Sequence, residues 1–341
     1  MYYSQINRFF SSSALSLNAL QHLKERSLIQ AKGPDVSEFL QGLITNDIHH
    51  ISEGVGSMFA MFLNNKGRVL YDTIIYKTEE KDSYMLECDS GASSALARHL
   101  SMFKVKRKVD ISTMDSYKVF VLYNGDIVGQ KKVKDFSVLK EYDKDLMPVN
   151  SLEFKMVDDM YVFKDPRVLQ LGFRVLSPKG SLTETLLNQS IPCSISNNYK
   201  KLRYSLGIGE GTEDLPMGNA FPLECNCDYL HGVSFHKGCY IGQELTARTY
   251  HTGVIRKRLM PLFFAKIPSN LPEENNIFLD QKRLGKLRGI DGDVGLGLLR
   301  VSQALEQKNI PIGDGEATVV KPDWWPIELP KEKLNVQHTT L

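Results

Sequence analysis

The chain has 341 residues, of which 42% are hydrophobic and 24% are charged, and its formal net charge is +2. A chain of this size is expected to form two or three globular domains, and its near-neutral charge argues against the basic footprint of nucleic-acid-binding proteins. Its apolar runs, such as 58–63, fall far short of the roughly 20 residues that cross a bilayer.

Cysteine usage favours a reducing compartment. An odd number of cysteines at irregular spacing in a long chain is not the pattern of a secreted disulfide framework. The five cysteines are Cys88, Cys193, Cys225, Cys227 and Cys239.

The N-terminal segment has the composition of a mitochondrial presequence. No Asp or Glu occurs between Met1 and Lys24, while Arg8 supplies positive charge and serines cluster at 11–13. A cationic amphipathic helix of this kind is drawn to an inside-negative membrane. A merely disordered tail is the alternative. We predict that residues 1–25 are a presequence outside the fold and that folded structure begins near Ile29.

The first half of the chain predicts mixed helices and strands. A helix is expected at 35–44, where apolar residues recur at helical spacing. Two strands at 59–63 and 69–76 flank the turn residues 64–67 and predict a hairpin. A further strand is expected at 84–88.

A helix after that strand places Leu96, Leu100 and Phe103 on one face, and the basic run 104–108 closes it. We interpret these basic side chains as complements to the helix dipole on a solvated face. Ligand binding is the alternative.

The second half predicts further strands, short helices and a separate C-terminal barrel. A long irregular loop rich in glycine and proline follows residue 208 and leads into a cysteine motif; loops of this length are more often functional. After 256, short apolar runs alternate with turn residues, which predicts a small antiparallel β barrel at 256–325 followed by a tail at 326–341. The expected strands are 119–123, 137–142, 160–163 and 171–175, and the expected helices are 181–187 and 199–208.

The chemistry is expected to centre on Cys239, within the octapeptide Lys-Gly-Cys-Tyr-Ile-Gly-Gln-Glu at 237–244. A helix is predicted to begin near Ile241, and the partial positive charge of its N-terminus would stabilise a thiolate. His236 and Lys237 would add positive potential. These features describe a reactive or metal-ligating thiolate.

Glycines on both sides of Cys239 support this interpretation. Gly238 and Gly242 remove side-chain bulk, so another molecule could approach the sulfur closely. A buried, inert cysteine is the alternative.

Two other cysteine arrangements are weaker candidates. Cys225 and Cys227 would point the same way on a strand and could form a metal pair, although a single C-x-C favours a structural role. Cys239 and His251 could form a thiol hydrolase dyad, but such partners usually come from distant segments.

The octapeptide resembles the signature of the folate-binding YgfZ-type proteins, which are relatives of the glycine-cleavage T-protein, an aminomethyltransferase. The resemblance spans roughly 29–325. The residues that support Cys239 in this motif are Lys237, Gly238, Tyr240, Gly242, Gln243 and Glu244. Further matching segments are 43–47, 66–68, 165–167, 171–174, 222–224, 232–235 and 246–248.

Together with the presequence, the sequence resembles the mitochondrial branch of this family. That branch acts late in iron–sulfur biogenesis, when [4Fe–4S] clusters are made for matrix enzymes, together with A-type scaffold proteins that carry [2Fe–2S] clusters. The resemblance therefore implies a matrix assembly factor, monomeric alone, whose Cys239 serves as a cluster ligand or transfer thiolate shared with an A-type partner. Cluster iron prefers thiolate ligands, and one cysteine cannot hold a [2Fe–2S] unit alone.

The resemblance also implies an α+β fold built as a three-lobed ring around a folate-sized hole. The first lobe would combine 29–55 with about 145–255 and contain the cysteine motif. An α+β lobe at 56–144 would be inserted between them. The barrel at 256–325 would close the ring.

A tetrahydrofolate pocket is implied as well, with Tyr71, Asp72, Glu224 and Arg248 as candidate folate-binding residues. The catalytic aspartate of the T-protein falls on Ala95 in an ungapped comparison, and Asp89 lies out of register. Aminomethyl transfer would then lack its acid/base group. We therefore expect no T-protein activity.

Two enzyme hypotheses remain beside the assembly factor. One is a folate-dependent one-carbon (aminomethyl-type) transferase. The other is a thiol-based redox or hydrolytic enzyme that uses Cys239.

Overall fold

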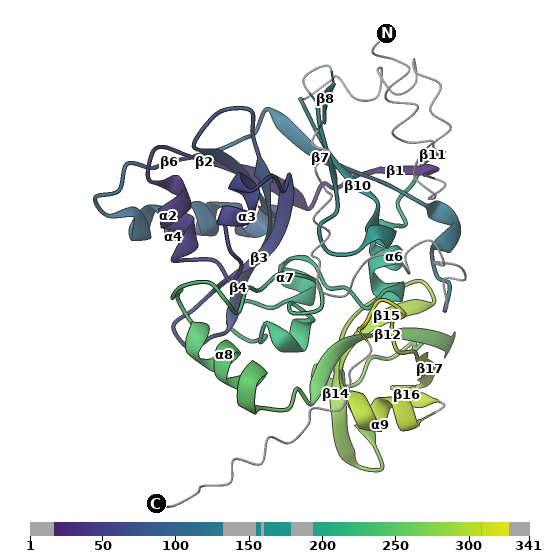
Figure 1. Cartoon of the computed structure of the whole chain (residues 1–341). Helices are drawn as coiled ribbons and strands as arrows, with labels where there is room; N and C mark the ends of the chain where they lie inside the picture. Colours follow the sequence, from purple (N-terminus) through teal and green to yellow (C-terminus); the bar gives the residue numbers. More distant parts are fainter. Residues whose placement is uncertain (1–16, 132–154, 158–159, 179–193, 308, 327–341) are drawn as a thin grey trace, which may run out of the picture.

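The computed structural model describes residues 17–131, 155–157, 160–178, 194–307 and 309–326. Three β-sheets organise this part of the chain, with helices packed against them, and the predicted α+β class is confirmed (Figure 1). None of its helices has the length and hydropathy needed to span a membrane.

The first sheet has six strands and mixes distant parts of the sequence. All its strand pairings are antiparallel, except that β1 pairs in parallel with the edge strand β11. In spatial order it contains β11 (Ser194–Ile195), β1 (Ala19–His22), β7 (Tyr117–Tyr123), β10 (Phe173–Pro178), β9 (Met160–Lys164) and β8 (Lys155–Val157).

The strands predicted at 119–123 and 160–163 are confirmed by β7 and β9. The strand predicted at 171–175 begins later, at Phe173, because 169–171 forms a 3-10 turn. Gly172 closes that turn with φ +76°, and a Cβ there would lie 2.2 Å from the Leu122 carbonyl oxygen. The strand predicted at 137–142 and the helix predicted at 181–187 lie outside the described residues.

The second sheet has five antiparallel strands and confirms the predicted hairpin and the strand at 84–88. Three helices accompany it: α2 (Val36–Gln41), α3 (His49–Ser52) and α4 (Ser93–Lys104). In spatial order the strands are β3 (Ser57–Leu63), β4 (Val69–Lys77), β5 (Ser83–Asp89), β2 (Arg26–Lys32) and β6 (Asp110–Thr113).

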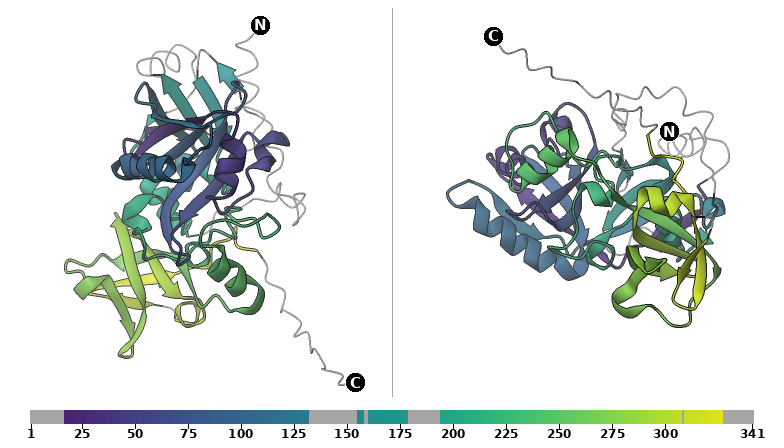
Figure 2. Two further views of the ribbon diagram at one scale, coloured as in Figure 1. Left: turned by 90° about the vertical axis from the view of Figure 1, so that its left-hand side faces the viewer. Right: turned by 90° about the horizontal axis from the view of Figure 1, so that it is seen from below.

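Both faces of this sheet are buried, and alternate side chains enter different cores. Phe62 and Ile75 pack with helix residues such as Leu96, whereas Phe59 and Tyr76 pack with residues of the first sheet. The helices therefore cover one face and the first sheet covers the other (Figure 2). In α4, Leu96 and Leu100 are buried as predicted, but Phe103 is 43% exposed.

Residues after 256 form the predicted C-terminal barrel, a six-stranded antiparallel sheet. The barrel is nearly closed, because its two edge strands, β13 and β16, also contact each other. Its elements are β12 (Lys257–Lys266), β13 (Asn276–Leu279), β14 (Lys282–Asp291), β15 (Val294–Arg300), α9 (Val301–Glu306), β16 (Ile310–Ile312) and β17 (Gly315–Val319).

In the sequence, three helices fall between the last strand of the first sheet and the barrel: α6 (Tyr199–Ser205), α7 (Gly211–Asp214) and α8 (Gln243–Thr252). The predicted helix at 199–208 is thus shorter, since Gly207 adopts φ +72°. After the barrel, the Nε1 of Trp324 donates a hydrogen bond to the Leu206 carbonyl oxygen at 2.8 Å. This contact joins the end of the barrel to the segment that follows α6.

The fold begins earlier than predicted. Leu17, Leu20 and Leu23 are buried, and β1 pairs with β7. The prediction that the first 25 residues lie outside the fold is therefore wrong for residues 17–25. Residues 1–16 lie outside the described residues, where the presequence stays a prediction.

Strand pairing also divides the chain differently from the predicted lobes. β2 pairs with β5 and β6, so 29–55 belongs to the same sheet as 57–113 rather than to the segment 145–255. The inserted unit is thus about 26–113, between β1 and β7. The strand order supports this division, because the first and last strands of the inserted unit, β2 and β6, pair with each other.

Candidate functional site

Cys239 lies exposed on an irregular loop that precedes α8. The helix begins at Gln243 rather than near Ile241 as predicted, because Gly242 adopts a left-handed conformation with φ +79° as its N-cap. Cys239 therefore lies four residues before the helix start, rather than two as predicted.

Lys237 fixes the loop to the end of α2. Its buried ammonium group donates three hydrogen bonds to carbonyl oxygens, those of Gln41 at 2.8 Å, Ile44 at 2.8 Å and Asn46 at 2.6 Å. Burial lowers the pKa of Lys237 to about 8. The charge is thus directed at carbonyl groups near the helix C-terminus, where cations are favoured. Lys237 holds the loop and is not the added cation beside Cys239 that we predicted.

The segment after α2 binds the start of the same loop. The Thr45 hydroxyl donates to the Gly232 carbonyl oxygen at 2.6 Å, and the Asn46 side-chain amide donates to the His231 carbonyl oxygen at 2.8 Å. The Ile241 N–H donates to the Gly42 carbonyl oxygen at 3.1 Å. The loop is consequently held at both ends and in the middle.

The two motif glycines have different roles. A Cβ on Gly242 would lie 2.4 Å from the Asn64 carbonyl oxygen and 3.1 Å from the Cα of Gly67, so this glycine is required where α8 meets the β3–β4 turn. A Cβ on Gly238 would meet nothing within 4 Å. The space beside Cys239 is therefore open to another molecule at Gly238, as predicted, whereas the same prediction is wrong for Gly242, which is closely packed.

The remaining motif residues support the helix and the core. Tyr240 is buried, and its ring lies 5.0 Å from the Lys237 ammonium. Burial raises the pKa of Tyr240. Gln243 opens α8, and the Glu244 carboxylate is exposed, 3.8 Å from the Arg248 guanidinium one turn later.

Neither of the two alternative cysteine arrangements is present in the described residues. Cys225 and Cys227 are buried in a turn rather than on a strand, and burial raises the pKa of both thiols, that of Cys225 to about 12. No hydrogen bond joins Cys239 to His251 in the described residues, and the His251 ring instead lies 5.2 Å from that of Tyr250. Over the same residues, no group of three His, Cys, Asp or Glu side chains is placed to hold a metal ion.

The four folate candidates lie in different surroundings. Tyr71 is buried in the helix-covered core, 5.9 Å from the His99 ring. Asp72 is buried, and its carboxylate contacts the Arg26 guanidinium at 3.1 Å. Arg248 is exposed on α8. The structure does not bring these three side chains together.

Glu224, the fourth candidate, lines a cavity of about 620 Å³ between the β3–β4 turn and the barrel. Burial raises the pKa of Glu224 against the opposing effect of Lys257, Arg288 and Arg68. The Nε of Arg288 is buried, and it has no hydrogen-bond partner among the residues that the structure describes. Six cationic side chains line the cavity: Arg68, Lys257, Arg283, Lys286, Arg288 and Arg300.

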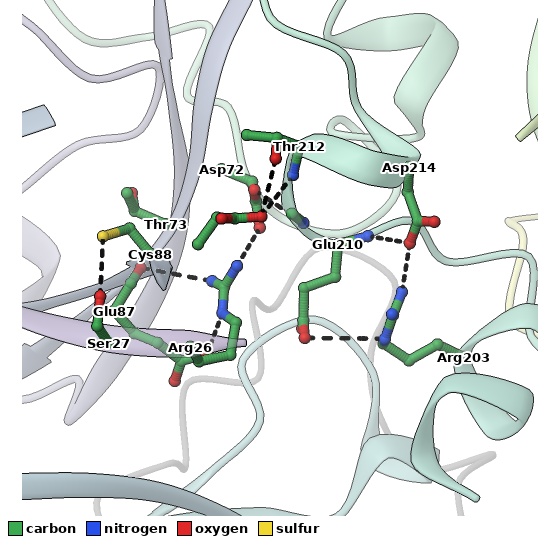
Figure 3. A network of polar contacts seen from close by, with 12 residues as sticks. Arg26, Ser27, Asp72, Thr73, Glu87, Cys88, Arg203, Glu210, Thr212 and Asp214 are labelled. Carbon is green, nitrogen blue, oxygen red and sulfur yellow. Dashed lines mark hydrogen bonds and ion pairs between the residues drawn. The ribbon is translucent and has the colours of Figure 1, made fainter. Parts of the chain in front are cut away.

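A buried network of charges joins the second sheet to α6 and α7 (Figure 3). Arg26 contacts Glu87 at 2.8 Å and Asp72 at 3.1 Å, and Arg203 contacts Asp214 at 2.7 Å. Figure 3 shows Arg26 between the two carboxylates that it binds.

Glu210 connects this network to the first sheet. Its carboxylate lies 2.5 Å from the Arg174 guanidinium and 2.8 Å from that of Arg167. Burial opposes its ionisation, but the surrounding arginines outweigh this effect and hold the pKa of Glu210 well below its ordinary value. Several buried atoms here have no hydrogen-bond partner in the described part of the chain, namely Arg167 Nη1, Arg174 Nη1, Arg203 Nε and Glu210 Oε1.

Sequence reasoning did not assign this network, although two of its segments, 165–167 and 171–174, carried part of the family resemblance. Asp89, which lay out of register with the T-protein aspartate, is engaged at its edge. Its carboxylate accepts hydrogen bonds from the N–H and hydroxyl of Thr212, at 2.8 and 3.0 Å. Ala95 lies in α4 and packs against the helix-covered core.

Comparison with known proteins shows which family the chain resembles. Residues 256–327 match the family model described as the C-terminal beta-barrel domain of CAF17. The chain is 37% identical over 333 residues to "Iron-sulfur cluster assembly factor IBA57, mitochondrial" of Mus musculus, covering 89% of this chain and 84% of that protein. It is 33% identical over 328 residues to the Homo sapiens protein of the same name, with the same coverage, 89% and 84%.

A solved structure confirms the predicted fold. The aminomethyltransferase T of the glycine cleavage system from Bartonella henselae superposes with a TM-score of 0.68, covering 90% of this chain and 86% of that chain. Its sequence identity is 14%, so this likeness concerns the fold alone. The names of the closely matching relatives confirm the predicted mitochondrial location. The chain therefore belongs to the IBA57 family of mitochondrial iron–sulfur cluster assembly factors.

Proposed function

We propose that this chain acts late in the maturation of [4Fe–4S] proteins in the mitochondrial matrix, and that Cys239 binds iron of a cluster carried by an A-type partner. One observation carries the proposal. Cys239 is exposed beside Gly238, where nothing lies within 4 Å of an added Cβ, while Lys237 anchors the same loop. The family relationship supports it, because the relatives are named as iron–sulfur cluster assembly factors.

The proposed chemistry requires one thiolate ligand from the chain. The Cys239 thiol gives up its proton to solvent, and its thiolate replaces one existing ligand on the cluster iron, which leaves; the cluster is cargo and not a resident cofactor. A [2Fe–2S] cluster takes four protein ligands, so the partner supplies the others. The anchored loop keeps the sulfur in one place as the partner docks.

Anaerobic reconstitution tests the proposal. A [2Fe–2S]-loaded A-type scaffold protein is mixed with wild-type chain, with Cys239→Ser or with Gly238→Ala, and the cluster is followed by visible absorption and circular dichroism. We expect wild type to form a mixed complex that activates a [4Fe–4S] enzyme, and Cys239→Ser to lose both the complex spectrum and the activation. Equal spectra and activation for wild type and Cys239→Ser would contradict the proposal.

Gly238→Ala serves as the matched variant. The alanine methyl fits the isolated chain, so the fold should be retained, but it occupies the space through which the partner approaches. We expect weaker complex formation at unchanged thermal stability. Unchanged affinity would show that the partner does not approach past Gly238.

Tetrahydrofolate binding is the second candidate, and the Glu224 cavity favours it. Its volume suits a small ligand, and its six cations suit a ligand that carries carboxylates. Of the four residues predicted from the sequence, Glu224 is the one that this cavity supports as a folate contact.

Titration calorimetry with tetrahydrofolate tests this binding, with Arg288→Gln as the variant. We expect wild type to bind and Arg288→Gln to bind at least tenfold more weakly, because a guanidinium–carboxylate contact is lost. One-carbon turnover is measured separately with aminomethyl donors. Absence of turnover from a chain that binds folate would remove the transferase hypothesis and leave the binding hypothesis in place.

A further inference from the structure

The end of α4 and the turn after it carry exposed apolar and basic side chains together; we call residues 102–108 the basic tip. Met102 is 71% exposed, Phe103 43% and Val105 80%. The opposite face of the helix is buried through Leu96 and Leu100. The exposed apolar side chains therefore face solvent at the end of an element that is otherwise firmly packed.

The backbone of the basic tip is fixed. The Lys108 N–H donates to the Asp35 carboxylate at 2.7 Å, and the Lys104 ammonium donates to the Val109 carbonyl oxygen at 2.9 Å. Val105 adopts φ +46° and ψ −104°, a conformation that a β-branched residue rarely takes. The turn thus holds Val105 outward at a conformational cost that its own contacts do not explain.

The charge around these side chains is mainly positive. Lys106, Arg107 and Lys108 are exposed, and Lys104 is half-buried. Acidic residues nearby include Asp35, which is engaged by the Lys108 N–H, the exposed Asp110, and Asp82, whose carbonyl oxygen accepts from the Gly33 N–H. The charge of the whole chain is only +2, so the basic tip is a local concentration of positive charge.

We propose that the basic tip binds the surface of an anionic lipid bilayer. Apolar side chains at a projecting turn enter the headgroup region, while neighbouring cations meet lipid phosphates, and this combination gives reversible attachment. A stable protein interface buries about 800 Å² on each partner, more than a single helix end offers. Figure 1 shows α4 on the side of the molecule away from the barrel, so the basic tip reaches a flat surface unobstructed by that domain.

This attachment differs from cluster assembly at Cys239. The basic tip comprises the end of α4 and the turn that follows it, and its Lys108 N–H binds Asp35 at the start of α2. The Cys239 loop is anchored to the other end of that helix, at Gln41. The proposed membrane contact and the proposed thiol site therefore use different segments of the chain.

Vesicle flotation with the full chain tests the proposal. The vesicles contain either phosphatidylcholine alone or equal parts of phosphatidylcholine and phosphatidylglycerol. We expect flotation with the anionic vesicles at low salt, loss of flotation as salt rises, and none with phosphatidylcholine alone. Equal binding to both compositions, or binding to neither, would overturn the proposal.

Two tip variants separate the apolar and charged contributions. Val105→Gly with Met102→Gln removes the apolar side chains while glycine accepts the same φ, and binding should weaken about tenfold. Lys106→Gln with Lys108→Gln should weaken binding about 25-fold, roughly fivefold for each cation.

Matched controls lie elsewhere on the surface. Leu271→Gly removes an exposed apolar side chain from the barrel, and Lys282→Gln with Lys321→Gln removes two exposed lysines from the same domain. Both should float as wild type does. Flotation that is insensitive to the tip variants, or equally sensitive to the controls, would assign lipid binding to another surface and reject the basic tip.

Discussion

Lys237 and Asn46 are separated by 191 residues in the sequence and are joined by a hydrogen bond of 2.6 Å from the ammonium to the carbonyl oxygen. This bond and its two companions place the cysteine loop against the end of α2. The loop that carries Cys239 therefore packs against a helix that covers the second sheet, although the loop lies far from that sheet in the sequence.

Replacing Lys237 by Met is expected to lower the free energy of unfolding by about 2–4 kcal/mol, because three carbonyl oxygens lose their donor. Urea denaturation at pH 7 measures the change. Lys66→Met, which removes an exposed lysine from the neighbouring turn, is the control and should alter stability by less than about 0.5 kcal/mol. A Lys237→Met variant as stable as this control would contradict the anchoring role.

Gly242→Ala and Gly238→Ala form a second matched pair. The first places a side chain at φ +79° and against the Asn64 carbonyl oxygen, and it should cost about 1–3 kcal/mol. The second meets open space and should leave stability unchanged. Thermal denaturation followed by circular dichroism compares the two, and an equal loss for both would refute the distinction between these glycines.

The buried network predicts a specific loss of stability in acid. Glu210 has a folded-state pKa well below its ordinary value of 4.5, so the unfolded chain takes up the proton first as pH falls. Its contribution is complete above about pH 4.5 and declines below it. Urea denaturation between pH 7 and pH 3 should show this decline in wild type.

Glu210→Gln should lower stability at pH 7 by about 3–5 kcal/mol, because buried arginines lose a counter-charge. It should also flatten the decline below pH 4.5. If the variant keeps the wild-type slope, another carboxylate is responsible for the acid sensitivity.

Thiol reactivity should distinguish Cys239 from the buried cysteines. N-ethylmaleimide labelling followed by peptide mass spectrometry is expected to modify Cys239 rapidly and to leave Cys88, Cys225 and Cys227 protected until the chain unfolds, because only Cys239 among these four is exposed. Rapid labelling of Cys225 or Cys227 in the folded chain would show that the turn containing them opens.

Local patterns predicted the elements that depend on local residues. The hairpin at 59–76 followed from two largely apolar segments around a turn, and the barrel followed from short strands with turn residues between them. The motif around Cys239 predicted an exposed thiol with open space beside it. Each of these signals lies within a short window of sequence.

Features that depend on distant partners were missed. Arg26 meets Glu87 across 61 residues, and nothing near Arg26 in the sequence indicates that it is buried. A charged residue on a strand ordinarily suggests a solvent-facing side chain. The same reason explains why Lys237 was interpreted as a cation beside Cys239, since its three acceptors belong to a segment almost two hundred residues earlier.

The anchored loop has a consequence for the speed and strength of docking. A cysteine on a free loop must give up conformational entropy each time it meets a partner, and that loss weakens the complex. The contacts of Lys237, Thr45 and Asn46 already order the loop when the chain folds, so this entropy is not lost on docking. Under the proposed function, a partner that carries a labile cluster would meet a sulfur already in position, which would shorten the time during which the cluster is exposed to water and oxygen.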